Sequence, residues 1–365
     1  MHMRKTFCAI MGKVDQEMKK ASIVDVAKMA GVSIATVSNV CTGNKYVSKE
    51  LEQSVLDAIE KLNYKPNYMA SSLRSQKSKM IAVMIPSYAM EYYGEMLQGI
   101  QDVAASRGCV ITTFETKSMI EREIDYLYIA SELMVSGVII LSQAMDCDED
   151  SNKRYSRALT ELTTREGRIP VISVMRRTGV DTVDELLLDN VHSSADAVKY
   201  LISLGHTKIG TITGGTDSVI ARDRCEGYKK ALTEAGIPID ENRIVNMPDY
   251  SAKSGFYGMQ KLLKETDVTA VFTGNDKLAM GAMKGAAAMG KKVPEDVSVI
   301  GFDGVSTCEL VTPALSTVDV SSYEVGRMAM DRLFKRMANE DLPYEPQVIR
   351  SPVVARQSTS LLKGI

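Results

Sequence analysis

The chain has 365 residues, of which 45% are hydrophobic and 25% charged, and its formal net charge is −2. That length predicts two or three domains with ample buried core, and no apolar run approaches the ~20 residues of a membrane-spanning helix. The six cysteines are scattered without a Cys-x-x-Cys pair, and there are only three histidines. This pattern argues against a metal site and a Ser-His-acid triad, and free thiols are typical of a reducing cytoplasm.

The first twenty residues contain a short apolar run that resembles the start of a signal peptide. Arg4 and Lys5 precede this run, and Lys13 and Asp15 interrupt it. A secretory signal needs an apolar core of about 7–15 residues and a small-residue cleavage site. We therefore expect no export, and we interpret residues 1–20 as a disordered extension of a cytoplasmic protein.

The next stretch predicts two short helices joined by a tight turn. Ser22 can cap the first helix with Asp25 three residues on, as in a capping box. Gly31 supplies the turn, Ser33 caps the second helix, and a third amphipathic helix follows Ser48. Two helices at a sharp angle braced by a third are typical of the helix-turn-helix DNA reader, although ordinary helical core gives the same pattern.

The second helix presents mostly small polar side chains to the outside, while Val37 and Val40 point inward one turn apart. Ile34 lies at its outer start, where a solvated helix usually carries a charge, and a thymine methyl in the major groove would suit this side chain. The outer positions are Ile34, Ala35, Thr36, Ser38 and Asn39.

Charge is segregated along the chain. From Lys19 to Lys79 there are ten Lys and Arg against five Asp and Glu, so this segment is +5, whereas residues 80–365 carry −8. A small basic head on a large acidic body fits a phosphate-binding module attached to a second function. A basic helical domain that does not bind DNA is the alternative.

From Met80 onward, apolar runs alternate with helical stretches, which predicts an α/β fold with parallel sheets. The length of this body allows two such sheets. The Gly-rich run 210–215 lacks the spacing of a phosphate loop, which argues against a nucleotide-binding enzyme. The expected strands are Ile81–Ile85, Val110–Phe114, Val138–Leu141, Val171–Val174, Ile209–Thr213, Ala270–Thr273, Val297–Phe302 and Leu315–Val318.

A series of motifs runs through most of the chain: Ile23–Val40, Tyr46-Val47-Ser48, Leu62–Asn67, Ser72-Leu73-Arg74, Gly205-His206, Thr273–Asp276 with Ala279-Met280-Gly281, Val293-Pro294, Gly301-Phe302-Asp303 and Arg356–Thr359. In their order and spacing over residues 22–360 they resemble the lactose-repressor (LacI/GalR) family of bacterial transcription regulators. The resemblance implies a helix-turn-helix headpiece and a periplasmic-binding-protein-like body of two doubly wound α/β lobes. Three crossovers would join the lobes, with a ligand cleft between them.

The resemblance also implies a division of the chain. We expect the headpiece at 21–66, a hinge helix and linker at 67–78, and an effector-binding and dimerisation domain at 79–365. Within that domain the N-lobe is expected at about 79–178 and 310–340, and the C-lobe at about 181–308 and 341–360.

DNA contacts are implied in both the headpiece and the hinge. Ile34 and Ala35, with Tyr46 nearby, are expected to contact base edges. In many family members the hinge helix wedges a leucine into the minor groove, and Leu73 is the matching residue. A flexible linker with an incidental leucine is the alternative. The remaining residues assigned to phosphates, flanking bases or the hinge contact are Thr36, Ser38, Asn39, Asn67 and Ala70.

Four residues stand where the family places effector contacts: Tyr93, Arg224, Tyr250 and Asp276. Aromatic faces with a guanidinium and a carboxylate suit a polar ring compound such as a sugar. We expect Arg224 and Asp276 to bind it from opposite lobes, with the tyrosines against its faces. The alternatives are packing tyrosines and a structural ion pair or helix cap, and Asp303 fits either role.

Three departures from the family pattern bear on specificity. Arg176 and Arg177 follow a strand where many sugar-binding members carry an acidic residue nearby, which favours a phosphorylated or carboxylate effector unless the arginines face water. Asn39 stands where many members carry Arg or His, so the operator half-site does not transfer. Gly304 stands where Asp or Asn is frequent, so a detailed ligand set does not transfer either.

We therefore interpret the chain as a cytoplasmic transcription regulator, a repressor that binds a palindromic operator as a homodimer. A carbohydrate-like effector would control it, without a cofactor, a metal, a membrane or an enzymatic activity. The C-terminus has no leucine heptads, which favours a dimer over a coiled-coil tetramer. A solute-binding protein of a transport system is the alternative, against which the basic headpiece and the missing export signal argue.

Overall fold

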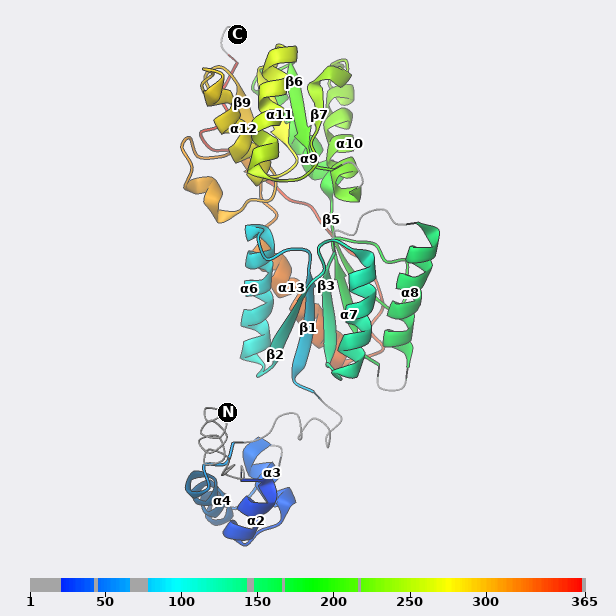
Figure 1. Ribbon diagram of the computed structural model, residues 1–365, viewed down its shortest axis with the longest axis vertical. Coiled ribbons are helices and arrows are strands. Elements are labelled where there is room, and N and C mark those ends of the chain that lie inside the picture. Colours follow the sequence, from blue (N-terminus) through cyan, green and yellow to red (C-terminus); the bar gives the residue numbers. More distant parts are fainter. Residues whose placement is uncertain are drawn as a thin grey trace, which may run out of the picture. The chain divides into compact units, whose positions relative to one another are not determined.

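The structure, a computed structural model, describes residues 21–42, 45–65, 78–142, 148–165, 168–215 and 218–362 (Figure 1). The chain forms two compact units that divide between Ser78 and Lys79. The expected extension at 1–20 and the hinge residues Asn67, Ala70 and Leu73 lie outside the described residues.

The first unit is a three-helix domain of α2 (Ile23–Ala30), α3 (Ile34–Thr42) and α4 (Lys49–Lys61). The capping box at α2 is present: the Asp25 amide donates to Ser22 Oγ, and the Ser22 amide donates to Asp25 Oδ2 at 2.8 Å. Gly31 ends α2 with a φ of 67°, a left-handed conformation that a Cβ would disfavour. The axes of α2 and α3 then meet at 105°, within the range of helix-turn-helix motifs.

A small apolar core holds the three helices together. Its buried members come from all three helices and the segment after α4, and they are Val26, Ala27, Val37, Val55, Ala58 and Tyr64. Ser33 accepts a hydrogen bond from the Thr36 amide at 3.1 Å, as its predicted cap role requires. Ser48 stands at the N-cap of α4, but its side chain makes no capping hydrogen bond.

The second unit contains a larger sheet of six parallel strands, in the order β11-β5-β4-β3-β1-β2. Helices α6 (Glu91–Ser106) and α13 (Ser322–Ala338) contribute to the apolar core on one face, and α7 (Ile120–Glu132) and α8 (Glu149–Thr164) to that on the other. The strands are β1 (Met80–Ile85), β2 (Val110–Glu115), β3 (Gly137–Leu141), β4 (Val171–Val174), β5 (Asp184–Leu188) and β11 (Gln347–Ile349).

A smaller sheet of four parallel strands, in the order β7-β6-β8-β9, forms the second lobe of this unit (Figure 1). Its strands are β6 (Ile209–Thr213), β7 (Ile244–Asn246), β8 (Ala270–Thr273) and β9 (Ser298–Ile300). The helices packed against it are α9 (Asn190–Ser203), α10 (Val219–Glu234), α11 (Ala252–Glu265) and α12 (Asp276–Ala288). Helices α11 and α12 approach so closely that a Cβ on Gly281 would lie 1.9 Å from the Ala252 carbonyl oxygen.

The chain passes between the lobes three times. It leaves the larger sheet after β5, returns to α13 through β10 (Thr317–Val318), and leaves again after β11 through β12 (Val353–Val354). Strands β10 and β12 pair antiparallel, and the Ser358 carbonyl then accepts from the Val299 amide at 2.8 Å. The two short strands therefore bring two of the crossovers side by side.

The expected lobe division is wrong at two places. Residues 184–188 and 347–349 were assigned to the C-lobe, but as β5 and β11 they pair with each other and extend the N-lobe sheet. The N-lobe therefore continues to β5, and the C-lobe begins with α9. The expected strand Leu315–Val318 is only the two-residue β10, and β5, β7, β11 and β12 are additional to the predicted strands.

In the part of the chain that the structure describes, no single helix has the length and apolar content of a membrane span. Helices α2 and α3 reach those criteria only when they are counted together, across their 105° bend.

Candidate functional site

The predicted DNA-reading surface lies on α3 and in the segment before α4. Ile34 is 40% exposed and Tyr46 is 92% exposed, and Ala35 is exposed as well. Thr36, Ser38 and Asn39 are half-buried, and the Thr36 hydroxyl lies 2.9 Å from Ser33 Oγ. No charged residue lies in the first or last turn of α3, so direct contacts from this helix would be apolar or neutral polar.

The predicted effector residues all follow the carboxyl ends of strands. Tyr93 lies in the first turn of α6 after β1, and Tyr250 follows β7. Arg224 lies in α10 after β6, whereas Asp276 opens α12 after β8 and Asp303 follows β9. The carboxyl ends of parallel strands are where α/β proteins usually bind small molecules, and the topology places these residues there in both lobes.

Arg224 is the centre of this cluster and is only 4% exposed. Its Nε donates to Asn190 Oδ1 at 3.0 Å, and its Nη1 donates to the Gly274 carbonyl and to Asp303 Oδ1 at 3.2 Å. The guanidinium also lies 3.7 Å from the centroid of the Phe302 ring. Three protein acceptors and an aromatic face thus fix one edge of the guanidinium, as a preorganised binding group requires.

Asp303 adopts a φ of 123°, which is strained for any residue with a Cβ, and such strain clusters at functional sites. Burial raises the pKa of Asp303, and the nearby Asp276 carboxylate acts in the same direction, whereas the Arg224 guanidinium opposes both. The structure therefore brings Arg224 and Asp303 together as a buried ion pair.

Two tyrosines complete the cluster, and their hydroxyl groups are buried without a hydrogen-bond partner in the described residues. These are Tyr93 and Tyr250. Burial raises the pKa of Tyr93 far above its usual value. Asp303, Arg224 and Tyr250 also lie near enough to influence this pKa electrostatically. Both hydroxyls are protonated at neutral pH and can donate to a bound molecule, and Ser218 and Thr213 lie beside that of Tyr250.

Sequence reasoning missed three members of the cluster. Tyr92 packs edge-on against Tyr93, with ring centroids 5.2 Å apart, and its hydroxyl donates to Met175 Sδ at 3.4 Å. Asn190 orients Arg224. The adjacent Tyr92-Tyr93 pair was visible in the sequence, but nothing local marks Met175 or Asn190, because tertiary packing brings them to the cluster.

Asp276 makes hydrogen bonds within the fold that the sequence did not predict, and its effector contact stays a prediction. Its Oδ2 accepts from the Gly304 and Val305 amides at 2.7 and 3.1 Å, and its Oδ1 accepts from the Thr317 hydroxyl. These bonds occupy both carboxylate oxygens and tie down the segment after β9. Asp276 and Arg224 also belong to the same lobe, so the expectation that they bind a ligand from opposite lobes is wrong.

Arg176 also departs from the expectation. Its guanidinium donates to Asn152 Oδ1 at 3.1 Å and lies 4.6 Å from the centroid of Tyr155, on the α7 and α8 face of the larger sheet. It is mostly buried, and it points away from Tyr92 and Tyr93, which lie on the other face. Only Arg177 of the predicted pair is exposed.

Hydrogen bonds also join the two lobes beside the cluster. Glu91, at the start of α6, accepts from Ser306 Oγ at 2.6 Å, from the Thr307 amide at 3.2 Å and from the Thr307 hydroxyl. Glu95 accepts from the Ser306 amide at 3.1 Å. Burial raises the pKa of Glu91, but the bonds from Ser306 and Thr307 and the charge of Lys277 outweigh this and lower it. The carboxylate is therefore ionised and fully used as an acceptor.

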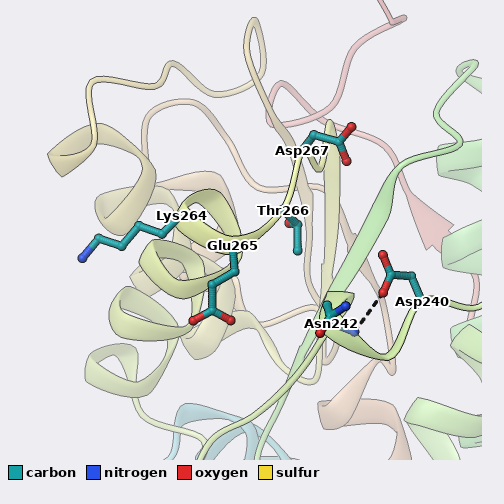
Figure 2. A pocket seen from close by; sticks show the side chains of 6 residues that line it. All are labelled: Asp240, Asn242, Lys264, Glu265, Thr266 and Asp267. Carbon is teal, nitrogen blue, oxygen red and sulfur yellow. Dashed lines mark hydrogen bonds between the residues drawn. The ribbon is translucent and has the colours of Figure 1, made fainter.

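A separate polar hollow of about 380 Å³ lies on the smaller lobe (Figure 2). It lies before β7 and β8, at their amino ends, and so opposite to the carboxyl ends where the cluster lies. None of the predicted effector residues lines it. The lining residues are Asp240, Asn242, Lys264, Glu265, Thr266 and Asp267. Within the described ranges no group of three or more His, Cys, Asp and Glu side chains is placed to hold a metal ion.

Two family descriptions match the chain: bacterial regulatory proteins of the lacI family over residues 22–67, and a periplasmic binding protein-like domain over residues 198–359. The HTH-type transcriptional regulator DegA of Bacillus subtilis strain 168 is 32% identical over 348 residues, which cover 94% of this chain and 99% of DegA. The chain belongs to the LacI family of bacterial transcription regulators. The predicted family, fold class and regulatory function are thereby confirmed.

Solved structures of LacI-family proteins share this fold. The crystal structure of the Lac repressor dimer bound to operator and the anti-inducer ONPF has a TM-score of 0.81 at 28% identity, covering 94% of this chain and 100% of that one. A LacI family regulator from Enterococcus faecium with bound ribose has a TM-score of 0.67 at 27% identity, covering 78% of this chain and 100% of that one.

Proposed function

We propose that this LacI-family regulator is a repressor that binds a palindromic operator as a homodimer, and that a sugar or sugar derivative in the cluster around Arg224 sets its affinity for DNA. The exposed apolar and neutral polar surface of α3 supports the DNA contact. The Lac repressor, whose structure is a dimer bound to operator, supports the assembly. The ribose-bound relative supports the class of effector.

The observation that carries the effector proposal is the pair of partnerless buried hydroxyls on Tyr93 and Tyr250 beside the Arg224–Asp303 ion pair. Buried polar groups without partners are costly and rare in native proteins. A polyhydroxylated ring supplies donors and acceptors on its edge and apolar C–H groups on its faces. Such a ring would pair the two hydroxyls, the guanidinium and the carboxylate, while the aromatic rings cover its faces.

The proposed control is a linkage between effector binding and the arrangement of the lobes. The cluster contains residues from both lobes, and the hydrogen bonds that Ser306 and Thr307 donate to Glu91 and Glu95 join the lobes beside it. An effector that binds one arrangement better shifts the population toward it by its difference in affinity. The hinge segment with Leu73 would transmit this shift to the headpiece, and Leu73 stays a prediction because it lies outside the described residues.

We further propose that the protein acts in the cytoplasm, without enzymatic activity or a cofactor. The regulators among its relatives support this, as does the use of the buried polar groups for binding. The alternative, a solute-binding protein of a transport system, predicts no affinity for DNA. Retention of the protein on a column of selected palindromic DNA at low salt separates the two functions.

Removing the hydroxyl of Tyr93 or Tyr250 should weaken effector binding without weakening the fold. The free protein loses no hydrogen bond in Tyr93→Phe or Tyr250→Phe, whereas the complex loses one, worth about 0.5–1.5 kcal/mol, or roughly two- to tenfold in affinity. Calorimetric titration with the sugar that binds best in a screen of sugars, sugar phosphates and nucleosides measures the affinity, and urea unfolding measures the stability.

Tyr228→Phe is the matched control for this pair. Its hydroxyl is also buried, but it donates to the Ile209 carbonyl at 2.8 Å. This variant should therefore lose about 1 kcal/mol of stability and keep its effector affinity. If Tyr93→Phe and Tyr250→Phe behave like Tyr228→Phe, their hydroxyls do not contact the effector.

Ile34→Asp should lower operator affinity by about 1–3 kcal/mol, the size of one lost base contact. The carboxylate would also lie close to phosphates that it repels. The operator is first selected from random DNA with the unaltered protein, and binding is then measured at fixed salt. The fold should survive because Ile34 is 40% exposed.

Leu56→Asp is the control for the headpiece. Leu56 is similarly exposed, but it lies on α4, outside the predicted DNA-reading surface. Equal operator affinity for Ile34→Asp and the parent protein would contradict the assignment of α3 as the reading helix. An equal loss in Leu56→Asp would point to a general charge effect.

A further inference from the structure

A polar layer closes the core on the α7 and α8 face of the larger sheet, at the carboxyl ends of the strands. Glu123 from α7 is 0% exposed, and its Oε1 accepts from Ser142 Oγ at 2.8 Å. Its Oε2 lies 3.9 Å from Arg176 Nη1. Tyr155 from α8 supplies the ring beneath the Arg176 guanidinium. A buried carboxylate and a nearly buried guanidinium thus face each other just beyond the end of β4.

This cluster is poorly satisfied. Glu123 Oε2, Arg176 Nη1 and Tyr155 Oη are all buried, and among the described residues none of them makes a hydrogen bond of good geometry, although the Tyr155 hydroxyl lies beside the Glu123 carboxylate. A buried ion pair repays the loss of hydration only when its geometry is good and its remaining polar atoms are paired. The Glu123–Arg176 pair meets neither condition, so stability alone does not explain it. The pair instead fixes the position of the Arg176 side chain.

Arg176 is adjacent in the chain to a residue of the proposed effector cluster. Met175 has a φ of 74°, a left-handed conformation that is strained for a residue with a Cβ. Its sulfur accepts from the Tyr92 hydroxyl, and its amide donates to the Leu186 carbonyl at 2.8 Å. Met175 therefore contacts the α6 face of the sheet while Arg176 is held on the opposite face. The Ser173 hydroxyl donates to the Arg176 carbonyl at 2.8 Å and braces the same turn.

We propose that Glu123 and Tyr155 are positioning residues for the effector cluster: from the far face of the sheet they hold Arg176, and so fix the turn at Met175 against which the Tyr92 ring is set. The inference rests on the proposed function, because it gives the turn a role in effector binding. It also assigns Arg176 a role other than contact with an anionic effector. Tyr92 in turn packs on Tyr93, so a shift of the turn would reach the partnerless hydroxyl.

The test uses the full chain with methionine labelled as [methyl-13C]methionine, and the Met175 methyl signal is assigned with Met175→Leu. The methyl is bonded to the sulfur that accepts from the Tyr92 hydroxyl at 3.4 Å, so its chemical shift reports the turn without any ligand. Glu123→Gln keeps the size of the side chain and an acceptor for Ser142, but it removes the charge that faces Arg176. The Met175 signal should move in this variant, whereas the signals of Met29 in the headpiece and Met259 in the C-lobe should stay.

Glu121→Gln is the matched control, because this glutamate lies on the same helix and pairs with Arg154 at the surface. Its Met175 signal should equal that of the parent protein. Arg176→Gln removes the other half of the pair and should move the signal as Glu123→Gln does. If Glu123→Gln does not fold, the Met175 signal of Arg176→Gln provides the test. A lowered melting temperature with an unmoved Met175 signal in the folded variants would show a merely structural pair and overturn the proposal.

The role in binding is tested by titrating the same labelled proteins with D-ribose and cellobiose. We expect the Met175 signal of the parent protein to respond to a sugar that binds, and the affinity for that sugar to fall in Glu123→Gln and Arg176→Gln but not in Glu121→Gln. A Met175 signal that moves in the variants but responds to neither sugar would count against the proposed effector class. In that case the structural link between Arg176 and the turn would still hold. Unchanged affinity in variants whose turn has moved would overturn the positioning role itself.

Discussion

Arg224→Met should lower the free energy of unfolding of the body by about 3–5 kcal/mol, because it removes one partner of a buried ion pair. The substitution leaves the Asp303 carboxylate, 5% exposed, without its counter-charge. It also leaves the Asn190 side-chain oxygen and the Gly274 carbonyl without the donors that now reach them. Urea unfolding of the variant and the parent protein at pH 8 measures the difference.

The pH dependence of that loss separates charge from packing. Burial already raises the pKa of Asp303, and removal of Arg224 should raise it further, because the guanidinium opposes the shift. A carboxyl group whose folded pKa lies above its unfolded value costs stability at high pH, and the cost is relieved as the pH falls through the folded pKa. The deficit of Arg224→Met should therefore be smaller at pH 5.5 than at pH 8.

The double variant Arg224→Met with Asp303→Asn completes a double-mutant cycle of unfolding free energies. Neither charge remains in it, so its stability should exceed that of Arg224→Met alone, and the two single effects should not add. Additive losses with no change between pH 8 and pH 5.5 would mean that Arg224 stabilises the lobe by packing on Phe302 and not through Asp303.

The headpiece could be predicted because its signals are local. Each of these signals depends on residues a few positions apart in the sequence: the capping box of Ser22 and Asp25, the left-handed Gly31 and the inward Val37. The strands that are buried on both faces were also predictable, since β1 and β3 are continuous apolar runs and β4 is interrupted only by Ser173. In each case the pattern depends on residues close in the sequence, so it can be recognised without knowledge of the tertiary structure.

Strand β5 was missed because its first residues are charged. Asp184 is buried in the sheet only because α13 supplies two arginines for it, Arg332 with Nε at 2.8 Å and Arg336 with Nε at 2.9 Å. These partners lie about 150 residues further along the chain, so the sequence around Asp184 does not predict them. Strand β11 was missed because it is a short strand at the edge of the sheet, where β5 is its one neighbour among the described strands.

The proposed effector cluster could be assembled in part from the sequence. Family motifs located Tyr93, Arg224, Tyr250 and Asp303, and the structure brings these four together. The motif at Asp276 predicted a carboxylate that faces a ligand, and it did not predict the bonds that this carboxylate accepts within the fold. Here the Gly304 and Val305 amides face it. The path of the chain after β9 determines that these amides lie against the carboxylate, and the sequence does not predict this path.

Asp276→Ala should lower the stability of the C-lobe by several kcal/mol and reduce effector affinity only as a consequence. The substitution leaves the Gly304 amide, the Val305 amide and the Thr317 hydroxyl without their acceptor. Each buried donor left unpaired costs about 1–3 kcal/mol. It also opens a void beside Gly301, where the carboxylate now lies so close that a Cβ would approach Oδ1 to 2.2 Å. Urea unfolding measures the loss, and hydrogen exchange of the two amides locates it.

Asp276→Asn tests whether the carboxylate acts as an acceptor in the fold or as a charge toward a ligand. The amide oxygen can still accept from the Gly304 and Val305 amides, and the amide nitrogen can donate to the Thr317 hydroxyl. The variant should therefore keep most of its stability, and the folded protein should bind the effector nearly as well as the parent, since the carboxylate faces the segment after β9. A stable Asp276→Asn protein that has lost a hundredfold or more in effector affinity would show that the carboxylate contacts the effector, as the sequence first indicated.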